Sequence, residues 1–175
     1  MGFQGSLILF LIMISGPSGT GKTSVAEQII EALSRSGIRT SFIKDIPHDD
    51  AEFDSRGKDT YRAVTRGAVM SIGRSPSRSF INIGGFVDLK ELLKFSENNS
   101  GVCIVEGFIQ EASAIKFDAH IDLQTRQSGG KSSAVYARVE VGSQIHEFRI
   151  INGSADLANF IVSFIEAIRD SGKSP

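Results

Sequence analysis

The sequence has 175 residues, which is enough for one domain with a sizeable hydrophobic core, and we expect a single domain over residues 1–175. A hydrophobic fraction of 41% and a charged fraction of 22% are typical of soluble globular proteins. The formal net charge of −1 creates no overall field that would attract nucleic acid or an anionic membrane, so we expect neither as a partner.

The only cysteine, Cys103, lies in an apolar run, which excludes an internal disulfide and favours a reducing, cytoplasmic location. The apolar run Leu7–Ile14 is too short to span a membrane and lacks the flanks of a signal peptide, so it predicts a buried strand. Met1-Gly2 with Ser6 matches a loose myristoylation pattern, but Ser6 leads directly into that strand, so we expect no lipid anchor.

In chain order, the strand Leu7–Ile14 is followed by a helix whose apolar residues recur at helical spacing and which ends before Gly37. The first half of the chain is expected to contain the helix Lys22–Ser36, the strand Arg39–Lys44, a polar loop Asp45–Gly57, a helix near Lys58–Arg66, and the strands Ala68–Ile72 and Ser79–Ile83 around the turn Gly73–Pro76.

The second half is expected to contain the helix Asp88–Glu97, the buried strand Val102–Val105, a strand His120–Leu123, an exposed turn-like segment Gln124–Ser133, a β-hairpin Val135–Ile150 with its turn at Gly142-Ser143, and the amphipathic helix Ala155–Arg169. Strands that alternate with helices indicate an α/β three-layer sandwich with a mostly parallel sheet, here with an added C-terminal β-hairpin and helix.

The segment from Gly16 to Thr23, which reads GPSGTGKT, satisfies the phosphate-binding pattern G-x-x-x-x-G-K-[ST] and lies between a predicted strand and a predicted helix. Its glycines let successive N–H groups approach phosphate oxygens, and the helix start adds its dipole. The pattern therefore predicts a P-loop for a Mg²⁺-nucleoside triphosphate, GTP or ATP, in a P-loop NTPase fold. The expected nucleotide contacts are Gly16, Ser18, Gly19, Thr20, Gly21, Lys22, Thr23 and Ser24.

A P-loop also needs acidic groups at the carboxyl edge of its sheet, where ligands of such folds bind. Lys22 is expected to reach the β- and γ-phosphates, and the Thr23 hydroxyl to ligate Mg²⁺. Glu106 follows the buried strand Val102–Val105 and is the expected Walker-B-like acid. Asp45 follows the second strand at the same edge and is expected either to contact Mg²⁺ or to orient the attacking water. Together Thr23, Glu106 and Asp45 form the predicted metal set.

Two other clusters of charged residues each allow two interpretations. The loop from His48 to Asp54 carries one His and four carboxylates, which would suit a second metal or a γ-phosphate sensor, although a solvated acidic loop is the commoner meaning. The basic residues Lys58, Arg62, Arg66, Arg74 and Arg78 would suit a phosphorylated ligand or simply a charged surface.

Three parts of the sequence occur in the order seen in the molybdopterin-guanine dinucleotide biosynthesis protein B (MobB) family, which the sequence resembles over about Leu7–Phe108. They are the P-loop, the stretch from Ile43-Lys44 to Gly57-Lys58-Asp59-Thr60-Tyr61-Arg62, and Val105-Glu106-Gly107-Phe108. The resemblance implies a P-loop domain that binds GTP with Mg²⁺, hydrolyses it weakly, forms a homodimer with an extended sheet, and assists a molybdopterin guanylyltransferase. It also implies phosphate and Mg²⁺ roles for Lys22 and Thr23 and the strand-end acid role for Glu106.

Two alternatives stay open at this point. One is a small nucleotide or metabolite kinase, because Gly16-Pro17-Ser18-Gly19 is also similar to guanylate-kinase-like P-loops, with Gln124–Ser133 as the segment where an Arg-rich lid would be sought. The other is a P-loop scaffold without turnover. The acid expected to read guanine is Asp122, with Asp118 as the second candidate.

Overall fold

The computed structural model describes residues 9–46, 54–128, 132–150 and 153–171. Two compact units make up the chain, one formed by Met1–Asp45 with Leu89–Pro175 and the other by Ile46–Asp88, and each is described by itself. The single domain expected over residues 1–175 stays a prediction. Leu7 and Ile8 of the predicted first strand lie outside the described residues, within which no helix is long and apolar enough to cross a membrane.

The larger unit contains a sheet with the strand order β2-β5-β1-β6-β7-β8. Four of its strands run parallel, namely β1 Phe10–Ser15, β2 Thr40–Lys44, β5 Val102–Glu106 and β6 Ala119–Ser128. All five residues of β5 are buried, as expected for the strand of a parallel sheet that is covered on both faces. The mostly parallel α/β sheet predicted from the sequence is thus present.

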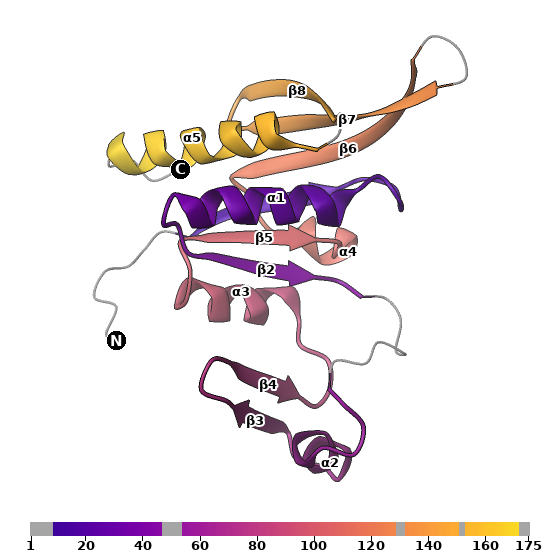
Figure 1. Cartoon of the computed structure of the whole chain (residues 1–175), viewed down its shortest axis with the longest axis vertical. Helices are drawn as coiled ribbons and strands as arrows, with labels where there is room; N and C mark the ends of the chain where they lie inside the picture. Colours follow the sequence, from indigo (N-terminus) through magenta and orange to yellow (C-terminus); the bar gives the residue numbers. More distant parts are fainter. Residues whose placement is uncertain (1–8, 47–53, 129–131, 151–152, 172–175) are drawn as a thin grey trace. The chain divides into compact units, whose positions relative to one another are not determined.

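The last two strands, β7 Ser132–Val141 and β8 Gln144–Ile150, continue the sheet in antiparallel fashion and confirm the predicted hairpin with its turn at Gly142-Ser143. The prediction of a turn over Gln124–Ser133 is wrong, because β6 continues to Ser128 and pairs with β7 along this stretch. Residues 125–127 are exposed and polar, so no apolar alternation marks them as a strand. The pairing with β7 extends β6 well beyond the parallel part of the sheet (Figure 1).

Helices cover the two faces of this sheet and complete the three-layer sandwich. On one face α1 Lys22–Arg35 and α5 Ala155–Ser171 pack beside each other (Figure 1), and on the other lie α3 Leu89–Glu97 and the short α4 Ile109–Ala112, which the sequence did not predict. A hydrophobic core joins β1 and β6 to the two long helices, α1 and α5. Its fully buried side chains include Ile12, Ile14, Ile29, Leu33, Leu123, Leu157 and Ile161.

The end of α1 shows why its boundary was predictable. Gly37 has a φ of 70° and its N–H donates to the Ser34 carbonyl at 3.0 Å, while the Ile38 N–H donates to the Leu33 carbonyl at 2.9 Å. This pair of bonds is a Schellman motif, in which glycine accepts the left-handed conformation that terminates the helix. The chain then returns across the sheet as β2.

The smaller unit consists of α2 Asp59–Thr65 and the hairpin β3 Met70–Arg74 with β4 Ser79–Ile83. The predicted helix and both predicted strands are present, but the turn was placed too early. Gly73 and Arg74 belong to β3, and the turn is closed by the Ser75 N–H donating to the Arg78 carbonyl at 2.7 Å. These strands pair only with each other among the described residues and form a separate sheet.

Candidate nucleotide site

The predicted P-loop connects β1 to α1 and adopts a conformation that only glycine supports at several points. Gly16, Gly19 and Gly21 have φ values of 133°, 76° and 87°. Gly16 also lies against β6, because a Cβ atom built on it would be 2.5 Å from the Leu123 carbonyl oxygen. Residues 17–19 are exposed, so the backbone between Gly16 and Thr20 is open to a ligand.

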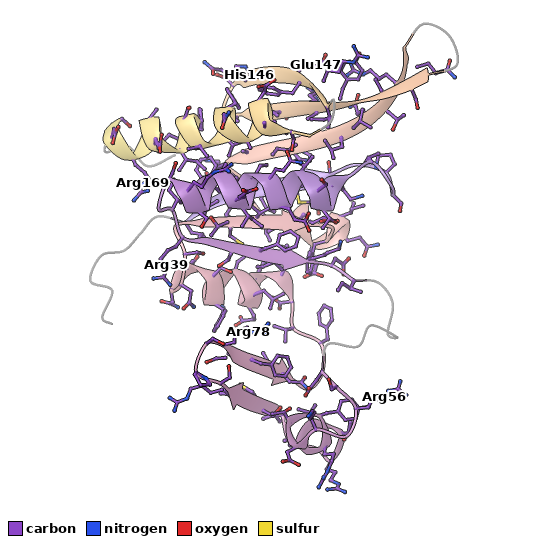
Figure 2. All side chains as sticks on the ribbon, in the orientation of Figure 1. Arg39, Arg56, Arg78, His146, Glu147 and Arg169 are labelled. Atoms are coloured by element: carbon purple, nitrogen blue, oxygen red, sulfur yellow. The ribbon has the colours of Figure 1, made fainter. Side chains whose placement is uncertain are left out.

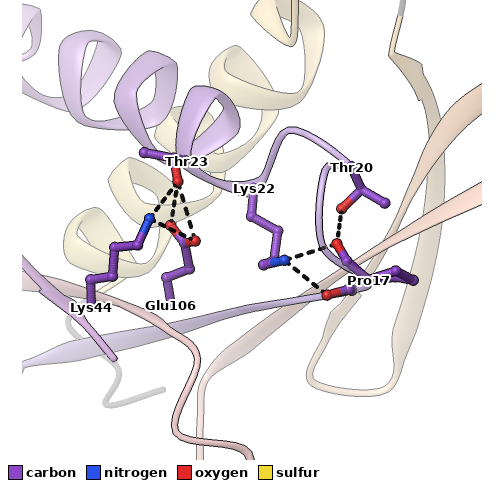
Figure 3. Close-up of polar contacts among 7 residues, drawn as sticks. Pro17, Thr20, Lys22, Thr23, Lys44 and Glu106 are labelled. Carbon is purple, nitrogen blue, oxygen red and sulfur yellow. Dashed lines mark hydrogen bonds and ion pairs between the residues drawn. The ribbon is translucent and has the colours of Figure 1, made fainter. Parts of the chain in front are cut away.

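Two side chains of the loop bond its own backbone (Figure 3). The Lys22 ammonium donates to the carbonyl oxygens of Gly16 and Pro17, each at 2.9 Å, and the Thr20 hydroxyl donates to the Pro17 carbonyl at 2.8 Å. Thr20 is buried, and its hydrogen bond stabilises the conformation of the loop. Lys22 is held over the loop by uncharged carbonyl oxygens, which a phosphate oxygen would outcompete as its acceptor.

At the base of the loop, Thr23, Lys44 and Glu106 form one cluster (Figure 3). The Thr23 hydroxyl donates to the Glu106 carboxylate, with its oxygen 3.0 Å from Oε2 and 3.2 Å from Oε1. The Lys44 ammonium donates to Thr23 Oγ1 at 2.8 Å and lies 3.2 Å from Glu106 Oε1. The predicted phosphate-binding and acidic residues are therefore in direct contact, although they are 83 positions apart in the sequence.

Sheet register explains this convergence. Glu106 is paired with Lys44 of β2 on one side and with Ile14 of β1 on the other, at the carboxyl ends of all three strands. Thr23 comes to the same edge because α1 begins at Lys22, immediately after the loop. The sequence alone assigned no role to Lys44. Lys44 lies beside Glu106 because β2 pairs with β5, and the sequence does not reveal that pairing.

The donor chemistry of this cluster fits Mg²⁺. A hydroxyl oxygen and a carboxylate are the kinds of ligand that Mg²⁺ prefers in nucleotide sites. The Lys44 ammonium lies against both of these groups, which shows that this position suits a positive charge. Within the described residues, no group of three His, Cys, Asp or Glu side chains forms a metal site by itself, so phosphate oxygens would have to complete the coordination.

Asp45 is placed beside the cluster but does not join it. Its backbone N–H donates to the Glu106 carbonyl at 2.9 Å, and a Cβ atom on Gly107 would lie 2.6 Å from the Asp45 Cβ. The Asp45 side chain is exposed at the same edge of the sheet. Its predicted role towards metal or water stays a prediction. Among the remaining predicted contacts, Ser18 and Ser24 are exposed, and the Ser24 hydroxyl accepts from Gln28 at 3.5 Å.

A second polar network lies directly before the loop. The Ser15 hydroxyl donates to Asp122 Oδ1 at 2.9 Å and contacts His120 Nε2 at 2.8 Å, and the Gln124 amide donates to Asp122 Oδ2 at 2.7 Å. Burial would raise the pKa of Asp122, but the hydrogen bonds from Gln124 and Ser15, with His120 and Arg138 nearby, lower it overall. Asp122 is thus a negatively charged group beside the loop, with both carboxylate oxygens engaged by its own chain.

Asp118, the second candidate for reading guanine, lies near the amino end of β1 instead. Its Oδ2 accepts from the Leu11 N–H at 2.7 Å, whereas the P-loop follows the carboxyl end of that strand. Burial raises its pKa in spite of this hydrogen bond. The contacts place Asp118 in the sheet rather than at the loop.

The other two clusters from the sequence fall within the smaller unit. The acidic loop His48–Asp54 lies outside the described residues except for Asp54, which accepts from the Thr60 hydroxyl at 2.8 Å. The basic cluster of Lys58, Arg62, Arg66, Arg74 and Arg78 belongs entirely to the smaller unit.

Comparison with known proteins gives the same family along most of the chain. The family model described as "Molybdopterin guanine dinucleotide synthesis protein B" (MobB) matches residues 11–137. A molybdopterin-guanine dinucleotide biosynthesis adapter protein of Escherichia coli is 38% identical over 74 residues, which cover 42% of each chain. The adapter protein of Haemophilus influenzae is 35% identical over 104 residues, which cover 58% of each chain.

Solved structures of MobB proteins are also similar. The MobB structure of Bacillus subtilis matches with a TM-score of 0.49 and 20% identity over 69% of this chain and 85% of that one. The MobB homologue of Bacillus stearothermophilus matches with a TM-score of 0.43 and 19% identity over 58% and 57%. The chain spans only 42–58% of the curated relatives that it matches. The family model nevertheless covers well over half of this chain, and the chain therefore belongs to the MobB family.

Proposed function

We propose that this protein is a GTP-binding accessory protein of molybdenum cofactor biosynthesis, with weak Mg²⁺-dependent GTP hydrolysis. The observation that supports this proposal most directly is the hydrogen bonding of the P-loop residue Thr23 to Glu106. The Thr23 hydroxyl oxygen lies 3.0 and 3.2 Å from the two carboxylate oxygens. The names of the two curated relatives support the pathway, and the choice of GTP over ATP is part of the proposal.

The chain's own residues have distinct tasks in this proposal. The loop backbone from Gly16 to Thr20 binds phosphate oxygens, and Lys22 transfers its hydrogen bonds from the carbonyl oxygens of Gly16 and Pro17 to the phosphates. Thr23 and Glu106 would hold Mg²⁺, which would neutralise charge on the transferred phosphate. Asp45, exposed at the same edge, is the proposed group that orients the attacking water.

The kinase alternative is less well supported because of the contacts of Arg126. This residue lies within β6, where its guanidinium forms hydrogen bonds of 2.6 and 3.2 Å to both oxygens of Glu147 and lies 5.1 Å from the centroid of the Tyr136 ring. Glu147 belongs to β8 and is labelled in Figure 2. An arginine that is fixed in a sheet by a bidentate ion pair differs from the mobile lid arginine that a small kinase needs.

Competition binding tests the nucleotide assignment. Purified protein is titrated with GTP and with ATP in the presence of Mg²⁺, and we expect tighter binding of GTP. Lys22→Ala should weaken GTP binding by at least about tenfold, since it removes a charge-assisted contact to phosphate. Equal affinities for GTP and ATP would reduce the assignment to a general P-loop NTPase, and unchanged binding by Lys22→Ala would contradict the site.

The proposed partners are a molybdopterin guanylyltransferase-type enzyme and a second copy of the chain. The strand order ends at β8, which pairs only with β7 among the described residues and therefore presents an open edge. Light scattering of the nucleotide-bound protein checks the homodimer, and a mass near 18.9 kDa would contradict it. Co-purification with the transferase, with and without GTP, checks the other partner.

A further inference from the structure

The Glu106 carboxylate is buried and needs a positive charge beside it. Its side chain is 7% exposed, while that of Lys44 is 37% exposed and reaches it from the end of β2. A buried carboxylate without a counter-charge would destabilise the fold or become protonated. Lys44 supplies this charge, with its ammonium 3.2 Å from Glu106 Oε1.

Lys44 also uses the same donor atoms that a metal ion would use. The Thr23 hydroxyl gives its hydrogen to Glu106 and presents a lone pair to the Lys44 ammonium, 2.8 Å away. A hydroxyl oxygen has a second lone pair, but Mg²⁺ bound to Thr23 and to an oxygen of the same carboxylate would lie close to this ammonium. Two cations held so close together repel each other, so the entry of Mg²⁺ favours movement of the Lys44 ammonium away from Glu106.

We propose that Lys44 is a resident counter-cation of Glu106 which leaves when Mg²⁺ enters, so that it reduces the dependence of nucleotide binding on Mg²⁺. This inference rests on the proposed nucleotide site and concerns its regulation. The flexible stem and partial exposure of Lys44 allow its ammonium to move away from Glu106 without a change in the backbone. When Mg²⁺ is absent, the ammonium screens the phosphates from the negative charge of Glu106.

The test compares GTP affinity in Mg²⁺ with GTP affinity in EDTA by calorimetric titration. Lys44→Met retains most of the apolar stem and removes the charge. Without Mg²⁺ this variant leaves Glu106 uncompensated next to the phosphates, so the ratio of the dissociation constants in EDTA and in Mg²⁺ should rise about fivefold. Lys90→Met, which removes an exposed lysine of α3, is the matched control and should leave the ratio unchanged.

The same titrations in a Glu106→Gln background test whether Lys44 acts through Glu106. Once the carboxylate is neutral, Lys44→Met should no longer change the ratio. A ratio that is unaffected by Lys44→Met in the parent, or affected equally in both backgrounds, would overturn the exchange while leaving the nucleotide site intact. A parent protein that binds no nucleotide in either buffer would overturn the proposed function, and this inference with it.

A readout without nucleotide guards against a folding defect. Urea unfolding of the parent, of each single variant and of the double variant measures the coupling between Lys44 and Glu106. We expect Lys44→Met to be destabilising alone and to lose most of that effect when combined with Glu106→Gln. Additive effects in this cycle would show that Lys44 does not compensate Glu106 and would overturn the inference.

Discussion

Gly16→Ala tests whether the P-loop depends on close contact with β6. Gly16 has a φ of 133°, in a region that only glycine occupies readily, and forcing alanine into it costs about 1–3 kcal/mol. The added Cβ would also lie 2.5 Å from the Leu123 carbonyl oxygen, well short of the 3.4 Å at which ordinary contact begins. Because that oxygen belongs to the backbone of a central strand, overpacking adds a cost of similar size. We expect a total loss of about 3 kcal/mol or more in the free energy of unfolding.

Gly19→Ala is the matched comparison within the same loop. Gly19 has a φ of 76°, and a Cβ atom on it would meet nothing within 4 Å, so only the left-handed backbone conformation is penalised, by about 1–2 kcal/mol. Urea unfolding of both variants without nucleotide measures the difference. Equal losses for the two substitutions would refute the argument that the loop is packed against Leu123.

Three further predictions concern other parts of the larger unit. Glu106→Gln should lower Mg²⁺-dependent GTP hydrolysis while GTP still binds, and unchanged turnover in a phosphate-release assay would reassign the acid. Cys103 is fully buried, and burial raises the pKa of its thiol to about 11, so labelling by a thiol reagent at pH 8 should be no faster than global unfolding. Gln28→Ala removes the oxygen that accepts from the buried Ser154 N–H at 2.6 Å, which should cost about 1–2 kcal/mol in urea unfolding, whereas Gln28→Glu retains an acceptor and should cost less.

The parts of the fold that follow from local patterns could be predicted from the sequence. The apolar strand β5 and the helix α1, which ends at Gly37, have the periodicity and the end signals on which such predictions depend. The short α4 escaped prediction because Phe108, which precedes it, has a left-handed φ of 54° that nothing in the sequence marks. The extension of β6 escaped because its exposed residues carry no alternation.

For the site, the sequence indicated which residues take part but not which of them lie beside one another in space. The motif from Gly16 to Thr23 and the acid Glu106 were identified because each stands at the end of a recognisable strand. The place of Lys44 depends on the pairing of β2 with β5, which is a long-range property of the sheet. The same limit applies to Asp122, whose partner Ser15 is brought beside it by the register of β6 against β1, whereas Gln124 is its neighbour two residues along the same strand.

The charge of Asp122 offers a last prediction, in which pH is the variable. The folded protein lowers the pKa of this carboxyl below its ordinary value of 3.8, so its ionised form stabilises the fold above that pH, and the contribution disappears as the pH falls through the lower folded value. Asp122→Asn keeps one acceptor for Ser15 but turns an amide donor towards the Gln124 amide, which loses about 1 kcal/mol at pH 7. The difference between parent and variant in urea unfolding should shrink steadily below about pH 4. A difference for Asp122→Asn that stays constant from pH 7 to pH 3 would mean that the packing of this side chain, and not its charge, stabilises the strand next to the P-loop.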